Sequence, residues 1–243
     1  MRLFGITDQG CVRSENQDSY CFVQAEDESW AVAVLCDGMG GVHGGRIASE
    51  LAAETFVDEA IYKLQEGSCD DLTVLIREAA SVANLRVYEH SLADSDCSGM
   101  GTTLVAVVIR GYDAAVANIG DSRCYWIRNG RIRQVTRDHS LVRNLVDRGV
   151  ITEAEALNHP RKNIITRAVG LEKSVKCDVF LPQLQAEDRL LLCSDGLSNL
   201  IHQAEILEIT QSTDTQEDAV HSLLDEALER GAPDNVTIVM MDC

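Results

Sequence analysis

Ala31-Val-Ala-Val-Leu-Cys-Asp37-Gly38 is an apolar run that ends in a carboxylate next to a glycine. A second run far along the chain, Leu190-Leu-Leu-Cys-Ser-Asp195-Gly196, ends in the same way. A third acidic turn, Gly231-Ala-Pro-Asp234-Asn235, stands directly before the apolar run Val236 to Met241. An apolar strand that ends in Asp-Gly places its carboxylate at a cleft edge, where the glycine lets the backbone approach a ligand closely.

Three such endings predict that carboxylates from separate strands converge. Asp37 could bridge two divalent ions, with the Gly38 carbonyl binding one of them and Asp195 and Asp234 binding from the other strands. Oxygen ligands of this kind suit magnesium or manganese. Two such ions can hold and deprotonate a bridging water and neutralise a phosphate during in-line attack. For any single ending, the alternative is that Asp-Gly is simply favourable turn chemistry.

One arginine and two further acidic residues are candidates for the same site. Arg13 precedes Asn16-Gln17-Asp18, and an arginine near paired metals can clamp a phosphate through two hydrogen bonds. Taken alone, Arg13 is better explained as a member of a surface salt bridge. Asp18 could hold metal-bound waters or be a turn carboxylate. Asp121, in a tight turn between two expected strands, could hold an additional, weaker ion or belong to a plain hairpin turn.

The spacing of apolar residues predicts runs of strands and pairs of helices. Long helices are expected over residues 47–64 and 72–87, and shorter ones at 141–148, 153–157, 205–209 and 217–230. Strands are expected at 2–7, 19–24, 30–36, 102–109, 114–118, 123–127, 131–135, 175–181, 189–193 and 236–241. Because strands and helices do not alternate strictly, this order favours an α+β domain in which helices cover antiparallel sheets.

Length and charge limit the classes of function. With 243 residues and 45% hydrophobic content, the chain is expected to form a single domain over residues 1–243. A net charge of -18 argues against nucleic acid and against an anionic membrane surface as partners. No leader peptide and no membrane-spanning run is evident, so we expect a cytoplasmic protein, with a monomer as the default.

The charge is unevenly distributed. Between Gly120 and Gly170 there are ten basic residues against five acidic ones. This excess is either a solvated face on an acidic body or a positive rim that attracts anionic, phosphorylated partners.

The nine cysteines form an odd set with no C-x-x-C pair and no cysteine–histidine cluster of zinc-site spacing. We therefore expect reduced thiols, mostly packed in the core. Cys36 and Cys193 lie beside the proposed carboxylates, where packing is favoured over a redox role.

Eight short motifs stand in order between Arg2 and Met241. They are Arg13-x-x-Asn16-Gln17-Asp18, Asp37-Gly-Met-Gly-Gly41, Gly99-Met-Gly-Thr102-Thr103, Asn118-Ile-Gly-Asp121-Ser-Arg123, Thr136-Arg-Asp138-His139-Ser140, Arg167-Ala-Val-Gly170, Ser194-Asp195-Gly196 and Pro233-Asp234-Asn235-Val236-Thr237. Each motif is weak alone, but eight in order closely resemble the metal-dependent serine/threonine protein phosphatases of type 2C, in their compact bacterial form.

This resemblance implies a four-layer αββα sandwich, with two central antiparallel sheets between helix pairs. It implies a binuclear manganese or magnesium centre formed by Asp37, Gly38, Asp195 and Asp234. Asp18 would act near it through water, Asp121 with Asp195 would hold a third ion, and Arg13 would bind the phosphate. Residues 140–165 would form a flap that helps to select substrates. The implied partners are phosphorylated proteins and a serine/threonine kinase whose action the enzyme opposes.

The chain departs from the family pattern at two places. Some relatives carry a histidine after the first Asp-Gly as a candidate general acid, whereas this chain has Met39 and leaves that role unassigned. His43 is nearby, although a solvated residue at a helix start is the favoured reading. Bacterial relatives often have His and Glu where this chain has Val42 and Arg46, which indicates a change at the cleft rim.

Two other functions are compatible with the same residues. A catalytically idle binding module on this fold would be expected to lack one or more of the carboxylates, and none is missing here. A phosphohydrolase acting on a small molecule or nucleotide would share the same reaction core. The flap is the one feature that favours a protein substrate.

Overall fold

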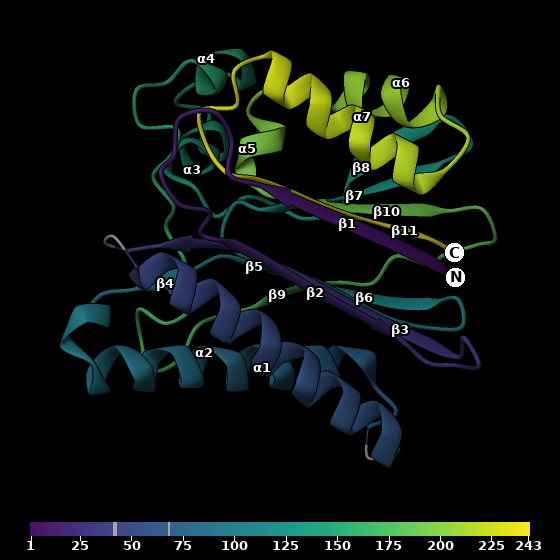
Figure 1. Cartoon of the computed structure of the whole chain (residues 1–243), viewed down its shortest axis with the longest axis horizontal. Helices are drawn as coiled ribbons and strands as arrows, with labels where there is room; N and C mark the ends of the chain where they lie inside the picture. The colour runs from purple at the N-terminus through teal and green to yellow at the C-terminus, as the bar shows by residue number, and fades with distance from the viewer. Residues whose placement is uncertain (41–42, 68) are drawn as a thin grey trace.

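Two antiparallel β-sheets lie face to face at the centre of the molecule, and a pair of helices covers the outer face of each (Figure 1). The computed structural model describes residues 1–40, 43–67 and 69–243. This is the four-layer αββα sandwich that the resemblance implies, and the α+β prediction is confirmed.

The first sheet joins the two ends of the described chain. Its strand order is β1-β11-β10-β7-β8, and every neighbouring pair is antiparallel. The strands are β1 (Arg2–Asp8), β11 (Val236–Asp242), β10 (Arg189–Cys193), β7 (Arg123–Arg128) and β8 (Arg131–Gln134). The predicted hairpin turn at Asn129-Gly130 links β7 to β8, and both of its residues have positive φ, as a type I′ turn requires.

The second sheet has the order β2-β3-β5-β6-β9, with the short β4 pairing with the end of β3. Its strands are β2 (Asp18–Gln24), β3 (Trp30–Met39), β4 (Gly101–Thr102), β5 (Leu104–Arg110), β6 (Asp113–Ile119) and β9 (Asp178–Phe180). Both sheets therefore bring strands from distant parts of the sequence to a common end of the sandwich.

Helices α1 (Gly44–Glu66) and α2 (Leu72–Ala93) cover the second sheet, and α6 (Gln203–Gln211) and α7 (Gln216–Glu229) cover the first (Figure 1). The shorter helices are η1 (Ser95–Cys97), α3 (Leu141–Asp147), α4 (Glu153–Leu157) and α5 (Asp195–Ser198). In the described ranges, no helix combines the length and the apolar character needed to cross a membrane.

Strand β3 is buried on both faces, which explains its unbroken apolar sequence. Val32 and Val34 pack against α1 and α2, whereas Ala33 and Leu35 face the other sheet. Alternate side chains of a strand point to opposite faces, so a central strand in a four-layer fold needs apolar residues at every position.

Three elements differ from the prediction. The strand expected at 175–181 is limited to Asp178–Phe180. The strand expected at 102–109 is interrupted at Thr103, because its hydroxyl accepts a hydrogen bond from the Asp37 amide. Asp195 begins the one-turn helix α5 and does not lie in an open strand exit.

Candidate metal centre

The predicted carboxylates come from both sheets and meet at one end of the sandwich. Asp18 begins β2 and lies opposite Asp37, near the end of β3. On the other sheet, Asp195 follows β10 and Asp234 precedes β11, the antiparallel neighbour of β10. The Thr237 hydroxyl donates a 2.7 Å hydrogen bond to Asp18 Oδ2 and so ties the two sheets together here.

Three backbone hydrogen bonds fix the position of Asp37. Its amide donates to Thr103 Oγ1, and its carbonyl accepts from Thr102 Oγ1 and from the Thr103 amide, each at 2.9 Å. The following residue, Gly38, lies directly beneath the first turn of α1. A Cβ atom there would lie 2.1 Å from the Gly45 carbonyl oxygen, so a side chain would push α1 away from β3.

Gly196 has the same packing role beside Asp195. A Cβ atom at Gly196 would lie 1.9 Å from the Asn235 carbonyl oxygen, so α5 packs directly on the turn that carries Asp234. Asn199, one turn later, donates to Asp195 Oδ2 at 3.0 Å. The glycine of each Asp-Gly pair therefore admits another protein backbone. The close approach expected at these glycines is therefore made by another segment of the protein backbone, and not by a ligand as predicted.

Burial and mutual repulsion make these acids hard to ionise. Burial raises the pKa of Asp37 well above its ordinary value, and the charges of Asp18, Asp195 and Asp121 add to the effect. Burial, with the charge of Asp195, raises the pKa of Asp18 to about 7 and that of Asp121 to about 8. The pKa of Asp195 is also raised, by burial and by the charge of Asp234. The positive charge near these carboxylates is therefore too small for all of them to ionise together.

The donor set fits divalent cations that prefer oxygen. Crowded carboxylates are costly without cations, and every candidate ligand here is a carboxylate or carbonyl oxygen, as manganese and magnesium prefer. Across the described ranges, no three of these carboxylates have oxygens within 4.8 Å of one another. The oxygens are thus spread more widely than a cage for one ion, which suits several ions whose coordination is completed by water.

Arg13 lies at the edge of this cluster. Its Nη2 donates to Asp234 Oδ2 at 2.7 Å, and its side chain is 55% exposed. That hydrogen bond raises the pKa of Arg13, against a smaller opposing effect of burial, and the charges of Asp37 and Asp195 also favour the cation. A guanidinium with exposed donors beside the carboxylates is placed to meet an anion at the cleft mouth.

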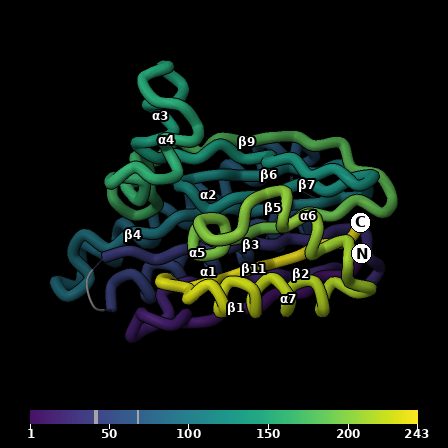
Figure 2. Tube along the Cα trace, turned by 90° about the horizontal axis from the view of Figure 1, so that it is seen from above, coloured from purple at the N-terminus to yellow at the C-terminus, as the bar shows by residue number. Residues whose placement is uncertain are grey.

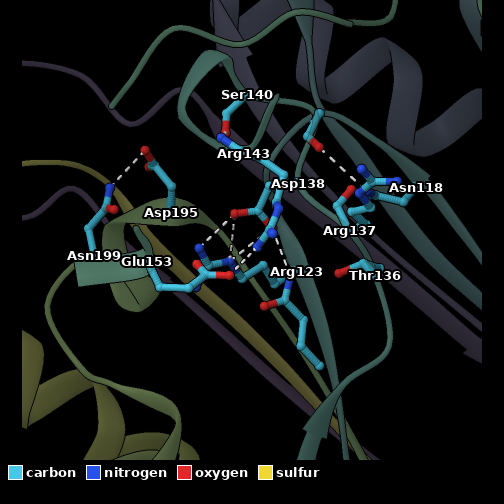
Figure 3. Close-up of polar contacts among 12 residues, drawn as sticks. Asn118, Arg123, Thr136, Arg137, Asp138, Ser140, Arg143, Glu153, Asp195 and Asn199 are labelled. Carbon is cyan, nitrogen blue, oxygen red and sulfur yellow. Dashed lines mark hydrogen bonds and ion pairs between the residues drawn. The ribbon is translucent and has the colours of Figure 1, made fainter. Parts of the chain in front are cut away.

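A second arginine, Arg123, borders the centre and had no role in the sequence analysis. Its Nη2 donates to Asp138 Oδ2 at 2.6 Å, and the two side chains point toward each other (Figure 3). Burial raises the pKa of Asp121 and of Asp195, and the charge of Arg123 opposes this in both. At Asp121 the charge of Asp138 acts against Arg123. The Asn129-Gly130 turn could have predicted this pair. It makes β7 and β8 a hairpin, and the hairpin brings the segment after β8, with Asp138, back beside Arg123 at the start of β7.

Two of the residues at which the chain departs from the family pattern lie near the end of β3 and the start of α1. Arg46 Nε donates to Glu15 Oε1 at 3.0 Å, and its Nη1 donates to Glu50 at 3.1 Å. His43 Nδ1 lies 3.4 Å from Glu15 Oε1, and the His43 side chain is 70% exposed. Met39 ends β3 and pairs with β4. Val42 lies outside the described residues.

Residues 140–165 project from the sandwich beside the centre. An antiparallel bridge closes the base of this segment, and α3 and α4 extend away from the sheets (Figure 2). A cavity of about 550 Å³ separates it from the carboxylates. Asp121 and Asp195 line one side of the cavity, and Arg143 and Leu157 line the other. A substrate chain entering here would touch both the centre and the projecting segment.

Half of the basic residues between Gly120 and Gly170 have carboxylate partners within the protein. Five of the ten basic residues form ion pairs: Arg123–Asp138, Arg128–Asp188, Arg137–Asp147, Arg143–Asp147 and Arg167–Asp178. This pairing favours a solvated, internally balanced face over a strongly positive rim.

All nine cysteines are free thiols. Cys36 and Cys193 are fully buried in the cores beneath the helices. Burial raises the pKa of Cys36 well above its ordinary value and that of Cys193 to about 12. These neutral thiols act as packing residues beside the carboxylates.

Comparison with known proteins agrees with this geometry. The model of the family "Protein phosphatase 2C" matches residues 12–235. The serine/threonine phosphatase Stp of Listeria innocua is 36% identical over 236 residues, which cover 97% of this chain and 93% of the relative. The crystal structure of the Mycobacterium tuberculosis serine/threonine phosphatase PstP superposes with a TM-score of 0.89 and 36% identity, covering 99% of this chain and 97% of that chain.

A further structure bears directly on the donor set. The catalytic domain of PstP in complex with two manganese ions superposes with a TM-score of 0.85 and 35% identity, and the match covers 99% of this chain and 97% of that chain. The match extends over both sheets and both helix pairs, so it includes every strand end that contributes a carboxylate. The chain therefore belongs to the protein phosphatase 2C family.

Proposed function

We propose that this protein is a metal-dependent phosphatase that hydrolyses phosphoserine and phosphothreonine in proteins. The observation that carries the proposal is the cluster of five carboxylates at the meeting point of the two sheets, with an exposed arginine at its edge. The full set argues against an idle binding module, because such a module has no need to retain acids that cost stability.

We assign the metal ligands as follows. Asp37, the Gly38 carbonyl, Asp195 and Asp234 would hold two manganese or magnesium ions. Asp18 would support them through water, and Asp121 would share a third ion with Asp195. When bound, such ions lower the pKa of a water to produce a nucleophile and neutralise charge on the phosphate.

Arg13 would bind and orient the phosphate. In the structure it uses one amino group on Asp234, which leaves further donors of its planar fork exposed to the cleft. This position allows Arg13 to hold two phosphate oxygens while Asp234 keeps the guanidinium aligned. We assign no side chain as general acid, because Met39 has no proton to donate and His43 faces Glu15.

The proposal extends to substrate selection and partners. We propose that residues 1–243 act as one catalytic domain, with residues 140–165 as a flap whose cavity receives residues that flank the phosphorylated side chain. The names of the relatives support phosphoproteins as substrates. An opposing serine/threonine kinase, a cytoplasmic location and a monomeric state complete the proposal.

Phosphate release from a phosphothreonine peptide tests this function. We expect turnover with manganese or magnesium, none with EDTA, and loss of turnover in Asp195→Ala. Asp214→Asn, an exposed acid in the loop between α6 and α7, is the matched control and should keep full activity. Metal-independent turnover, or an active Asp195→Ala variant, would contradict the assignment. Faster hydrolysis of nucleotides than of phosphopeptides would favour the small-molecule alternative.

A further inference from the structure

A second group of metal-binding side chains lies at the end of α2. His90 is in the last turn of that helix, Asp94 follows its last residue, and Cys97 ends η1. One ligand atom from each side chain lies within 4.8 Å of the other two. Within the part of the chain that the structure describes, no other three histidine, cysteine, aspartate or glutamate side chains meet this criterion.

The backbone holds these three residues in place. The Asp94 amide donates to the His90 carbonyl, and the Cys97 amide donates to the Asp94 carbonyl, each at 3.1 Å. Asp94 Oδ1 accepts from the Asp96 amide at 2.9 Å, whereas Oδ2 lies 3.8 Å from Cys97 Sγ. One carboxylate oxygen therefore fixes the turn, and the other faces the thiol.

The three residues differ in exposure in a way that suits a bound ion. Cys97 is 2% exposed, His90 is half-buried and Asp94 is exposed. The site thus has a dry side, at the sulfur, and a side open to solvent through which an ion can enter. The carbonyl end of α2 adds a partial negative charge, which favours a cation at this place.

We propose that His90, Asp94 and Cys97 form a zinc-binding site at the end of α2, separate from the carboxylate centre. One thiolate, one imidazole and one carboxylate are a ligand set that zinc accepts, with water in the fourth position. In a tetrahedral zinc site, ligand atoms lie about 3.4–3.8 Å apart, so closure from the present spacing needs only small side-chain rotations. The softer sulfur and nitrogen donors distinguish this site from the all-oxygen centre.

Such a site would bear on the catalytic end of the second sheet. The Cys97 carbonyl accepts from the Met100 amide at 3.1 Å, and the next two residues form β4. Strand β4 pairs with Gly38 and Met39 at the end of β3. An ion that fixes Cys97 would therefore stiffen the support of the strand that carries Asp37.

The cysteines and histidines alone have no zinc-type spacing along the chain. The pattern here is His-x-x-x-Asp-x-x-Cys, in which a carboxylate takes the middle place. The first step is one helical turn, and the second crosses the helix end into η1. Cys97 is buried, as expected for a cysteine that packs in the core. Packing does not require the contact between its sulfur and Asp94, and this contact makes the thiol a candidate metal ligand.

Titration with cobalt(II) tests the site without reference to phosphatase activity. Cobalt bound by a thiolate gives an intense charge-transfer band and visible tetrahedral bands, which an all-oxygen site does not give. We expect one equivalent of cobalt to produce these bands in the wild-type protein and zinc to displace it. The bands should disappear in Cys97→Ser and in His90→Ala.

Three further variants make the result decisive. Cys69→Ser, a half-buried thiol before α2, is the matched control and should retain the bands. Asp37→Asn should also retain them, which separates this site from the carboxylate centre. Asp94→Asn changes an exposed residue, so it tests the site even if Cys97→Ser fails to fold, and the bands should weaken. Absence of the bands in folded wild-type protein, or their persistence in Cys97→Ser, would overturn the proposal.

Discussion

An acid lies near each end of strand β10, and the surroundings of the two acids are opposite. Asp188, directly before the strand, accepts hydrogen bonds from Arg128 Nε at 2.6 Å and from the Gln185 amide at 2.7 Å. Burial alone would raise the pKa of Asp188, but these hydrogen bonds outweigh it and lower that pKa. Asp195, two residues after the strand, lies among other acids, and burial and their charge raise its pKa.

This difference separates a carboxylate that the protein itself neutralises from one that lies among other acids. The buried charge of Asp188 has a cation supplied by the protein, so the fold is complete without a ligand. In the described part of the chain, the two arginines nearest to the acids around Asp195 are already paired. Arg13 donates to Asp234, and Arg123 donates to Asp138. At the end of β10 near Asp188, an internal ion pair balances the charge. The end near Asp195 stays acidic, and metal ions would supply the missing positive charge there.

The largest effect should come from Asp37→Asn. We expect turnover of a phosphothreonine peptide to fall by at least about 10³-fold, because the acid at the middle of the cluster no longer binds cations. In EDTA the same variant should be at least as stable as the wild type, since a buried, repelled carboxyl has been removed. Peptide turnover and urea unfolding measure the two effects. An active variant would contradict the metal-binding role of Asp37. A large loss of stability in EDTA would show that the Asp37 carboxylate stabilises the fold, as the Asp188 carboxylate is expected to do.

Asp188→Asn should have the opposite profile. The change removes the negative charge that Arg128 binds at the buried Asp188 carboxylate, and we expect a clear loss in the free energy of unfolding. Activity per folded molecule should stay within about twofold, because the site is at the far end of the strand. The double variant Asp188→Leu/Arg128→Met should recover part of the stability. No recovery, together with lost activity, would show that the two ends are coupled.

The pH dependence of metal stabilisation should sharpen the comparison. In the folded, metal-free protein the pKa is about 7 for Asp18 and about 8 for Asp121, above the ordinary aspartate value of 3.8. The folded state then binds more protons than the unfolded state between these values, so stability from these groups falls as pH rises through this range. Manganese binds the ionised forms and should reverse the loss.

We therefore expect the manganese-induced rise in Tm to be small near about pH 5.5 and large near about pH 8.5. Differential scanning calorimetry with manganese or EDTA measures the difference. Asp121→Asn should reduce the upper part of this dependence, whereas Asp188→Asn should leave it unchanged. A manganese effect that is equal at both pH values would contradict the account.

The smallest effect should come from Thr237→Val. This change removes the hydroxyl that donates to Asp18 across the two sheets and also contacts Thr7 Oγ1 at 2.6 Å. Asp18 keeps its place but loses orientation, so we expect roughly tenfold weaker manganese binding with the fold retained. Fluorescence or calorimetric titration can measure the change. Thr213→Val, remote from the centre, is the control and should bind manganese as the wild type does.

Sequence patterns predict much of this site because apolar periodicity and Asp-Gly endings are local. The run before Asp37 is a central strand, and Asp195 and Asp234 meet because β10 and β11 are antiparallel neighbours. Apolar periodicity predicts only that helices cover antiparallel sheets. The four-layer arrangement was predicted from the resemblance to the phosphatase family.

What could not be predicted depends on contacts between distant segments. Gly38 and Gly196 are required because other backbones pack against them, and no local pattern indicates which segment does so. Arg123 gains its partner only after the β7–β8 hairpin folds back. Half of the basic residues between Gly120 and Gly170 pair with carboxylates, some of them far away in the sequence. Pairing of charges is a property of the folded chain, so counts along the sequence overestimate the positive field.

The most direct test of the account is the number of manganese ions that the carboxylate centre binds. Calorimetric titration, with Cys97→Ser as the background to exclude the second site, should give at least two ions per chain. Asp37→Asn in that background should lose them, and Asp188→Asn should keep them. Fewer than two ions in the folded protein, or equal binding by the Asp37→Asn variant, would contradict the claim that the acidic end of the sandwich is a metal centre.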